Sequence, residues 1–222
     1  MTATDIAPVW LWHVATGLHE RLPADVGDDW TVRLHGLLDE LPDAGSLFAV
    51  HVWQAETVLP LLAAGAQEGE AAVFVASEDL HRAATRGTTP DLDTWRTVLT
   101  PMLLHLYDAA YDRVGAYAEA HTGARDYALA NGFSVAEADG YGHEYAQLSS
   151  DANARACAEA HAQALGSALA RAYADDGCEA YADTFPAAQL RAVVRVLTER
   201  GDPDPAVRLA EGLLSALATS RP

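Results

Sequence analysis

The chain contains no lysine, so arginine supplies all 14 of its basic residues. Together with the abundance of alanine, glycine and aspartate, this indicates the codon usage of a high-GC bacterial genome and carries no chemical information. The chain has 32 acidic residues, and its formal net charge is -18. An acidic surface repels nucleic-acid phosphates. We therefore exclude nucleic acid as a partner and interpret the scattered acids as a solubility device.

Cysteine is scarce and long apolar runs are absent. Only Cys157 and Cys178 are present, in no spacing typical of a metal site, so neither a disulfide framework nor a thiolate zinc site is predicted. No apolar run approaches the ~18 residues that cross a bilayer, and the first residues lack the basic stretch of a secretory signal. We expect a cytoplasmic protein that does not bind a membrane.

Catalytic motifs are absent too. The chain has no phosphate loop, zincin helix, dinucleotide-binding fingerprint or nucleophile elbow. Any active site must therefore be assembled from histidines and carboxylates on helix faces. The sequence assigns no metal and no cofactor, and it leaves open whether the protein is an enzyme.

Alanine makes up a large share of the hydrophobic residues, which are 50% of the chain. Alanine is the best helix former and is depleted in strands. The 222 residues suffice for one domain with a proper core. We predict an all-α fold, a single domain over residues 1–222 built as a multi-helix bundle of about eight helices.

Residues that typically begin or end helices divide the chain into segments. The spacing of Ser134 and Glu137 predicts a capping box, and Asp204 followed by Pro205 is typical of a helix start. Ser150 or Asp151 can cap another helix. The remaining capping residues and prolines place the expected helices at about residues 5–21, 29–42, 91–131 with a kink or division at Pro101, 134–149, 151–175, 178–183, 187–200 and 205–219.

Residues 46–86 are the ambiguous part, because LFAVHVW and AAVFVA can be read as short strands or as helix. The string AGAQEGEAAVFVAS resembles the opening of the RecA-like sensory domains of some bacterial regulators, in which a Gly-x-x-Gly-Glu turn leads into a strand. No strand signal follows Ala76, and a sheet of two strands would leave its own faces uncovered. We therefore predict helices here, with at most two short strands between residues 46 and 76.

Three histidines are the candidate catalytic residues. His51, if its segment is helical, lies among apolar residues on the buried side, and His121 falls on the apolar face of its own helix. His161 lies near the inner edge of an alanine-rich helix. A neutral, hydrogen-bonded core histidine is the commoner explanation for each, but inner faces avoid titratable groups unless these are paired or used. Each can serve as acid, base or ligand.

A stripe of His105, Asp108, Asp112 and Glu119 resembles a set of metal ligands. The opposite face of that helix is apolar, so we interpret the stripe as a solvated surface and predict no metal site.

Two functions from different classes remain. The first is a small helical enzyme or small-molecule-binding protein, in bacterial specialised metabolism, whose pocket is lined by aromatic side chains and histidine. The alternative is a non-catalytic acidic adaptor, sensor or regulator that binds a protein partner. A small-molecule ligand, a protein partner and a homodimer are the partners that these hypotheses imply.

Overall fold

The computed structural model describes residues 7–38 and 46–220. Over these ranges the structure is helical throughout, with no strand, which confirms the all-α prediction. The cap predicted at residues 4–5 and the helix end predicted at Pro42 lie outside the described ranges. Within them, no helix combines the length and hydropathy that a membrane span requires.

Counted with α3, η2 and α4 as one continuous helix, the described residues form ten helices, against the expected eight or so. Their bounds are α1 Val9–His19, α2 Ala24–Leu38, α3 Phe48–Trp53, the π-helix η2 Gln54–Val58, α4 Leu59–Ala64, α5 Glu68–Thr85, α6 Leu92–Ala109, α7 Arg113–Ala130, α8 Val135–Ala174, α9 Cys178–Ala182, α10 Pro186–Glu199 and α11 Pro205–Thr219.

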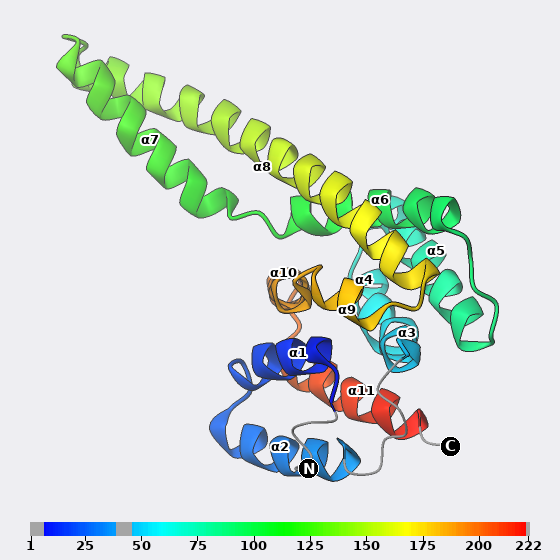
Figure 1. Cartoon of the computed structure of the whole chain (residues 1–222). Coiled ribbons are helices and arrows are strands. Elements are labelled where there is room, and N and C mark those ends of the chain that lie inside the picture. Colours follow the sequence, from blue (N-terminus) through cyan, green and yellow to red (C-terminus); the bar gives the residue numbers. More distant parts are fainter. Residues whose placement is uncertain (1–6, 39–45, 221–222) are drawn as a thin grey trace.

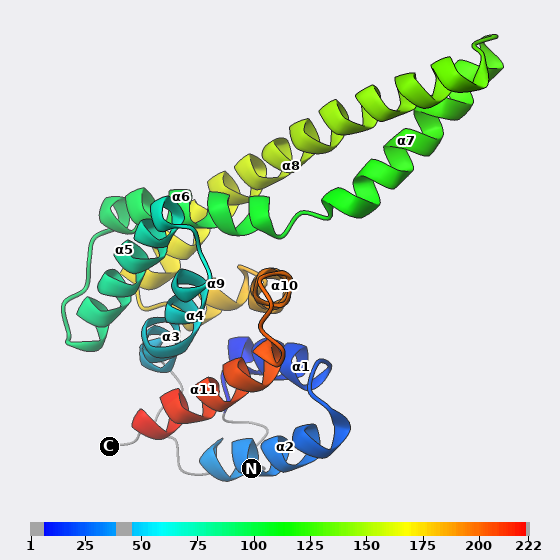
Figure 2. The same cartoon turned by 180° about the vertical axis from the view of Figure 1, so that it is seen from behind.

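Most helices gather into a body, from which α7 and the first half of α8 project as a two-helix arm (Figures 1 and 2). The body buries large side chains, including Trp10, Trp30 and Trp95. Two indoles also tie helices together: the Trp30 Nε1 donates to the Ala210 carbonyl at 2.9 Å, and the Trp53 Nε1 donates to that of Leu209 at 3.0 Å. Helices α2 and α3 are thereby fixed to α11.

Helix α8 connects arm and body along its 40 residues. A small residue recurs at every fourth position of α8 and is buried each time: Ala138, Gly142, Ala146, Ser150, Ala154, Ala158, Ala162, Gly166 and Ala170. Small side chains let helix backbones approach closely, and the first part of this stripe packs against α7 while the later part packs against α6. The arm therefore has a seam of small residues where the body has a core of large ones.

Region 46–86 is helical, as predicted. The segment that resembles a sensory-domain turn and strand instead ends α4 at Gly65 and continues in α5. The resemblance therefore does not extend to the fold.

Three predicted boundaries were wrong. Helix α2 begins at Ala24, directly after Pro23, and not at Asp28 or Asp29. Pro101 lies inside α6, and the division comes later, where the Asp112 carboxylate accepts a hydrogen bond from the Gly115 amide at 3.1 Å and caps α7.

The predicted cap at Ser150 or Asp151 was wrong for another reason. Ser150 is buried in the middle of α8, where its small side chain continues the seam of small residues. Local capping preference gave way to tertiary packing at this position.

Candidate functional site

Two histidines meet inside the body. His51 on α3 and His81 on α5 have their Nδ1 atoms 2.8 Å apart, and their side chains are 5% and 1% exposed. This distance is that of a direct hydrogen bond. One ring must donate its Nδ1–H and the other must accept with a bare Nδ1, so the two neutral imidazoles are held in opposite tautomers.

Both imidazoles are kept neutral by their surroundings. Burial lowers the pKa of His51 to about 4, although the Asp176 carboxylate acts in the opposite direction. Burial, together with the neighbouring His51, lowers the pKa of His81 well below its ordinary value. At neutral pH the pair therefore carries no charge and offers one Nε2–H donor and one bare Nε2 acceptor.

Aromatic rings enclose the pair. The Trp95 ring centroid lies 4.9 Å from that of His81 and stacks on His51 at 5.8 Å, and the Tyr173 ring lies 4.9 Å from both His81 and Trp95. Trp95 is fully buried, and its Nε1–H has no hydrogen-bond partner within residues 7–38 and 46–220. An unmet buried donor costs about 1–3 kcal/mol, so the surroundings of the pair are not optimised for stability alone.

A second polar layer begins at Tyr181 of α9. Its hydroxyl hydrogen-bonds with Tyr173 and with Gln54, and these contacts only partly oppose the burial that raises the pKa of Tyr181 above its ordinary value. Gln54 is the first residue of η2, where the backbone widens into a π-helix. Such π-helical turns are frequent at functional sites.

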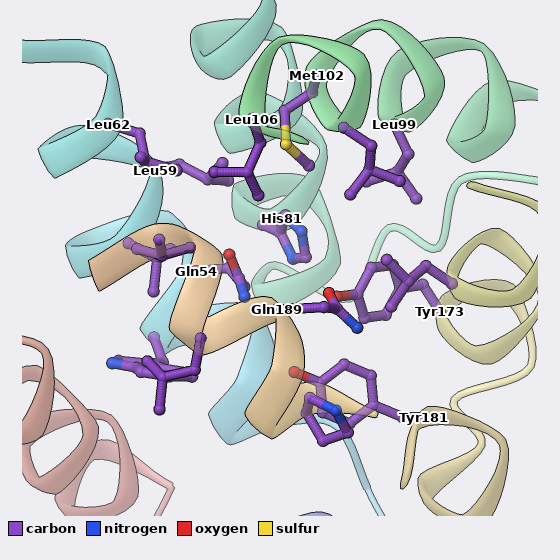
Figure 3. A pocket seen from close by; sticks show the side chains of 17 residues that line it. Gln54, Leu59, Leu62, His81, Leu99, Met102, Leu106, Tyr173, Tyr181 and Gln189 are labelled. Carbon is purple, nitrogen blue, oxygen red and sulfur yellow. The ribbon is translucent and has the colours of Figure 1, made fainter. Parts of the chain in front are cut away.

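His81, Tyr173, Tyr181 and Gln54 border an interior cavity of about 40 Å³. Its polar side chains come from separate helices and converge on the same space, as Figure 3 shows for His81, Gln54 and Gln189. The Gln189 amide nitrogen is fixed by donating to the Thr184 carbonyl at 2.9 Å. Of the residues that the structure describes, no arginine, aspartate or glutamate lines the cavity; its apolar walls are Trp53, Val58, Leu59, Leu62, Leu99, Met102, Leu103, Leu106, Leu169, Pro186, Leu190 and Val193.

The three histidines predicted from the sequence lie in different surroundings. His51 belongs to the buried pair. His121 lies on α7 in the arm, where its ring stacks near that of Tyr117 at 6.0 Å. His161 stacks on Tyr107 at 4.3 Å and donates from Nδ1 to a backbone carbonyl at 2.8 Å. Across the described ranges, no hydrogen bond or ring contact joins any two of the three, so the structure does not assemble them into one site.

The acidic stripe is divided between two helices. Asp108 pairs with Arg113 at 2.9 Å, and Asp112 pairs with Arg195 at 3.0 Å while capping α7. In the part of the chain that the structure describes, no group of three or more His, Cys, Asp or Glu side chains is arranged to hold a metal. The carboxylates of Asp108 and Asp112 thus serve surface pairing and capping.

Sequence reasoning missed most of the site. His81 had a signal, because Phe74, Ser77 and His81 follow one another at helical spacing and all three are buried. Projection of that helix would have placed His81 on its inner face. Tyr173 and Tyr181 had no such signal, since their contact depends on the turn between α8 and α9.

Comparison of the chain with protein-family models, with curated protein sequences and with solved structures finds no match.

Proposed function

We propose that the protein binds a small, uncharged ligand in the interior cavity, with His81 of the His51–His81 pair supplying a hydrogen bond to it. The observation that supports this proposal most directly is the convergence of His81, Gln54 and Gln189 on a space otherwise walled by aliphatic and aromatic side chains. A mostly apolar cavity with a few convergent polar groups is typical of ligand sites.

The residues that line the cavity favour an uncharged ligand. The two histidines of the pair are neutral, and among the described residues no aspartate, glutamate or arginine lines the cavity. Transfer of an ion into such a space would be costly, because nothing there compensates for its lost hydration. A neutral molecule with an apolar body and one or two hydroxyl, amide or carbonyl groups fits this lining.

The size of the cavity limits the ligand. About 40 Å³ accommodates a few water molecules, so a larger ligand must displace wall side chains. Met102 is the most adaptable of these, since its unbranched thioether fills irregular gaps. The same limit favours binding over catalysis, because a general base at His81 needs room beside it for a substrate.

Phenol, benzene and benzoate form a matched set of probes. We expect phenol to raise the melting temperature and to perturb the NMR resonances of cavity residues more strongly than benzene, and benzoate to do neither. The variant His81→Leu should weaken phenol binding about fivefold, since one buried hydrogen bond contributes ~1 kcal/mol. His143→Leu, on the exposed surface of the arm, is the control and should bind phenol like the wild type.

Failure of phenol, benzene and a panel of small neutral alcohols and amides to bind at all would contradict the proposal. Benzoate binding as tightly as phenol would contradict the charge argument.

Other sequence predictions remain proposals. These are the cytoplasmic location, the place in bacterial specialised metabolism, and the alternative role as an acidic adaptor. An adaptor that binds through its acidic surface would lose affinity steeply with added salt, whereas the affinity of the cavity for phenol should be insensitive to salt.

A further inference from the structure

The arm exposes more apolar surface than a solvated hairpin needs. Helix α7 packs chiefly against α8, and Figures 1 and 2 show the hairpin projecting from the body. Of the large hydrophobic side chains that are exposed, most lie on the arm, including Tyr127 at 63%, Tyr145 at 50% and Leu148 at 75%. The arm, which has the smaller interior, therefore carries most of the large hydrophobic side chains that are exposed.

These groups lie on one side of the arm. On the other side, Arg125 pairs with Asp139 at 2.5 Å, and the Tyr117 hydroxyl lies 2.6 Å from the His143 Nδ1. Helical spacing puts the following residues on the side away from these pairs: Ala116, Ala120, Gly123, Tyr127 and Ala130 of α7, and Tyr141, Tyr145 and Leu148 of α8. Phe133, in the turn, extends this surface, since its ring lies 6.3 Å from that of Tyr141. We call it the apolar face of the arm.

The area of this face is that of an interface. Aromatic side chains offer ~150–250 Å² each, so the exposed fractions of Tyr127, Phe133, Tyr141, Tyr145 and Leu148 add up to about 500 Å². The largest exposed apolar patch of a monomeric protein is about 300–600 Å² and is often functional. Two such faces brought together approach the ~1,000 Å² that a specific interface requires.

The stripe along α8 is complementary to itself when reversed. Glu137, Tyr141, Tyr145, Leu148, Ala152 and Arg155 follow one another at helical spacing, with an acid at one end, a base at the other and apolar side chains between them. Arg155 is exposed, and no ion pair involves it among the described residues. Antiparallel pairing of two α8 helices would set Glu137 against Arg155, Tyr141 against Ala152, and Tyr145 against Leu148, each large side chain facing a smaller one.

We propose that the apolar face binds a second copy of this chain, the two arms packing antiparallel about a two-fold axis near residue 146 to form a four-helix bundle. An interface of this symmetry uses the same patch on both subunits. Each copy then covers the apolar face of the other, and the two Glu137–Arg155 pairs fix the register and direction.

Sedimentation equilibrium with native mass spectrometry on the full chain tests the proposal. We expect a dimer of twice 23.6 kDa. Tyr145→Glu/Leu148→Glu should weaken dimerisation at least ~100-fold, because it places charges at the centre of the interface. Arg155→Glu should weaken it about tenfold at low salt and less at high salt, because it opposes Glu137 with a like charge. Gln147→Glu, which adds one negative charge on α8 outside the face, should leave the dimer unchanged.

Circular dichroism of each variant shows that its helices are intact. A wild-type chain that stays monomeric at ~100 µM, where even weak specific dimers form, overturns the proposal. So does a dimer that the Tyr145→Glu/Leu148→Glu variant leaves intact, or a different protein that occupies the arm in place of the second copy.

Discussion

The body and the arm achieve helical packing in opposite ways. The body encloses indole, phenol and leucine side chains around a buried histidine pair, whereas the arm joins its helices through alanine and glycine and leaves its aromatic residues in solvent. Burial of apolar area provides most of the stability of a fold. The body therefore buries enough apolar area to tolerate polar groups at its centre. The arm buries little apolar area unless another surface covers it.

Removal of the largest buried side chain at the histidine pair should have the largest effect. We expect Trp95→Ala to lower the free energy of unfolding of the body by about 3–5 kcal/mol, since it leaves a cavity in a packed core. Val114→Ala in the arm, at a side chain 83% exposed, should stay within about 0.5 kcal/mol of the wild type. Urea unfolding measures the free energy of unfolding of both variants. Equal losses would contradict the difference in packing between the body and the arm.

Acid should destabilise the body through the histidine pair. The pKa of His51 in the folded protein is about 4, below its ordinary 6.5, so the unfolded chain binds its proton first as the pH falls. The free energy of unfolding is therefore highest above pH 6.5 and decreases between pH 6.5 and 4, by on the order of 3 kcal/mol for His51. His81 shifts in the same direction and adds to the decrease.

The variant His51→Asn/His81→Asn isolates this effect. Its amides retain a hydrogen bond between the two positions and do not titrate. Its urea unfolding should show a shallower decrease between pH 6.5 and 4 than the wild type. Identical slopes would mean that other groups cause the acid sensitivity.

Two glycines of α8 test how closely α7 and α8 pack in the arm. A Cβ at Gly142 would lie 3.0 Å from the His121 carbonyl oxygen on α7, whereas one at Gly140 would meet nothing within 4 Å. We expect Gly140→Ala to stabilise the arm by up to ~1 kcal/mol through helix propensity. Gly142→Ala should lose that gain and separate the helices, so that it falls about 1–2 kcal/mol below Gly140→Ala. Hydrogen exchange of α7 amides reports the difference.

The smallest effect concerns the tip of the arm. Ser134 and Glu137 form a reciprocal capping box at the start of α8. Ser134→Ala should cost about 1 kcal/mol and increase exchange in the first turn of α8 alone. A matched loss of protection in the body would contradict the independence of the two regions.

Local signals predicted the parts of the fold that depend on local chemistry. The capping box at Ser134 was correct, because its side chains satisfy backbone groups within one turn. The start at Pro205 was correct because the fixed φ of proline suits the first helical position, although the Asp204 side chain makes no cap hydrogen bond. The division at Pro101 and the cap at Ser150 were wrong, because packing along α8 outweighed both. A proline or serine is compatible with a helix interior when a neighbouring helix stabilises that helix.

The site could be predicted only in part. His51 was identified by its apolar surroundings, which belong to its own helix. Its partner His81 lies 30 positions away, and Tyr181 reaches the cavity only through the turn between α8 and α9. Contacts of this kind are set by tertiary structure, and a single sequence without a known motif does not reveal them.

The central claim is that a neutral histidine pair lies inside the body, and ¹⁵N NMR of the imidazole nitrogens at pH 7 tests it most directly. We predict two histidines that stay neutral well below the ordinary range, His51 down to about pH 4, one with its proton on Nδ1 and the other with its proton on Nε2. Titration of all nine histidines near the ordinary pKa of about 6.5 would contradict it.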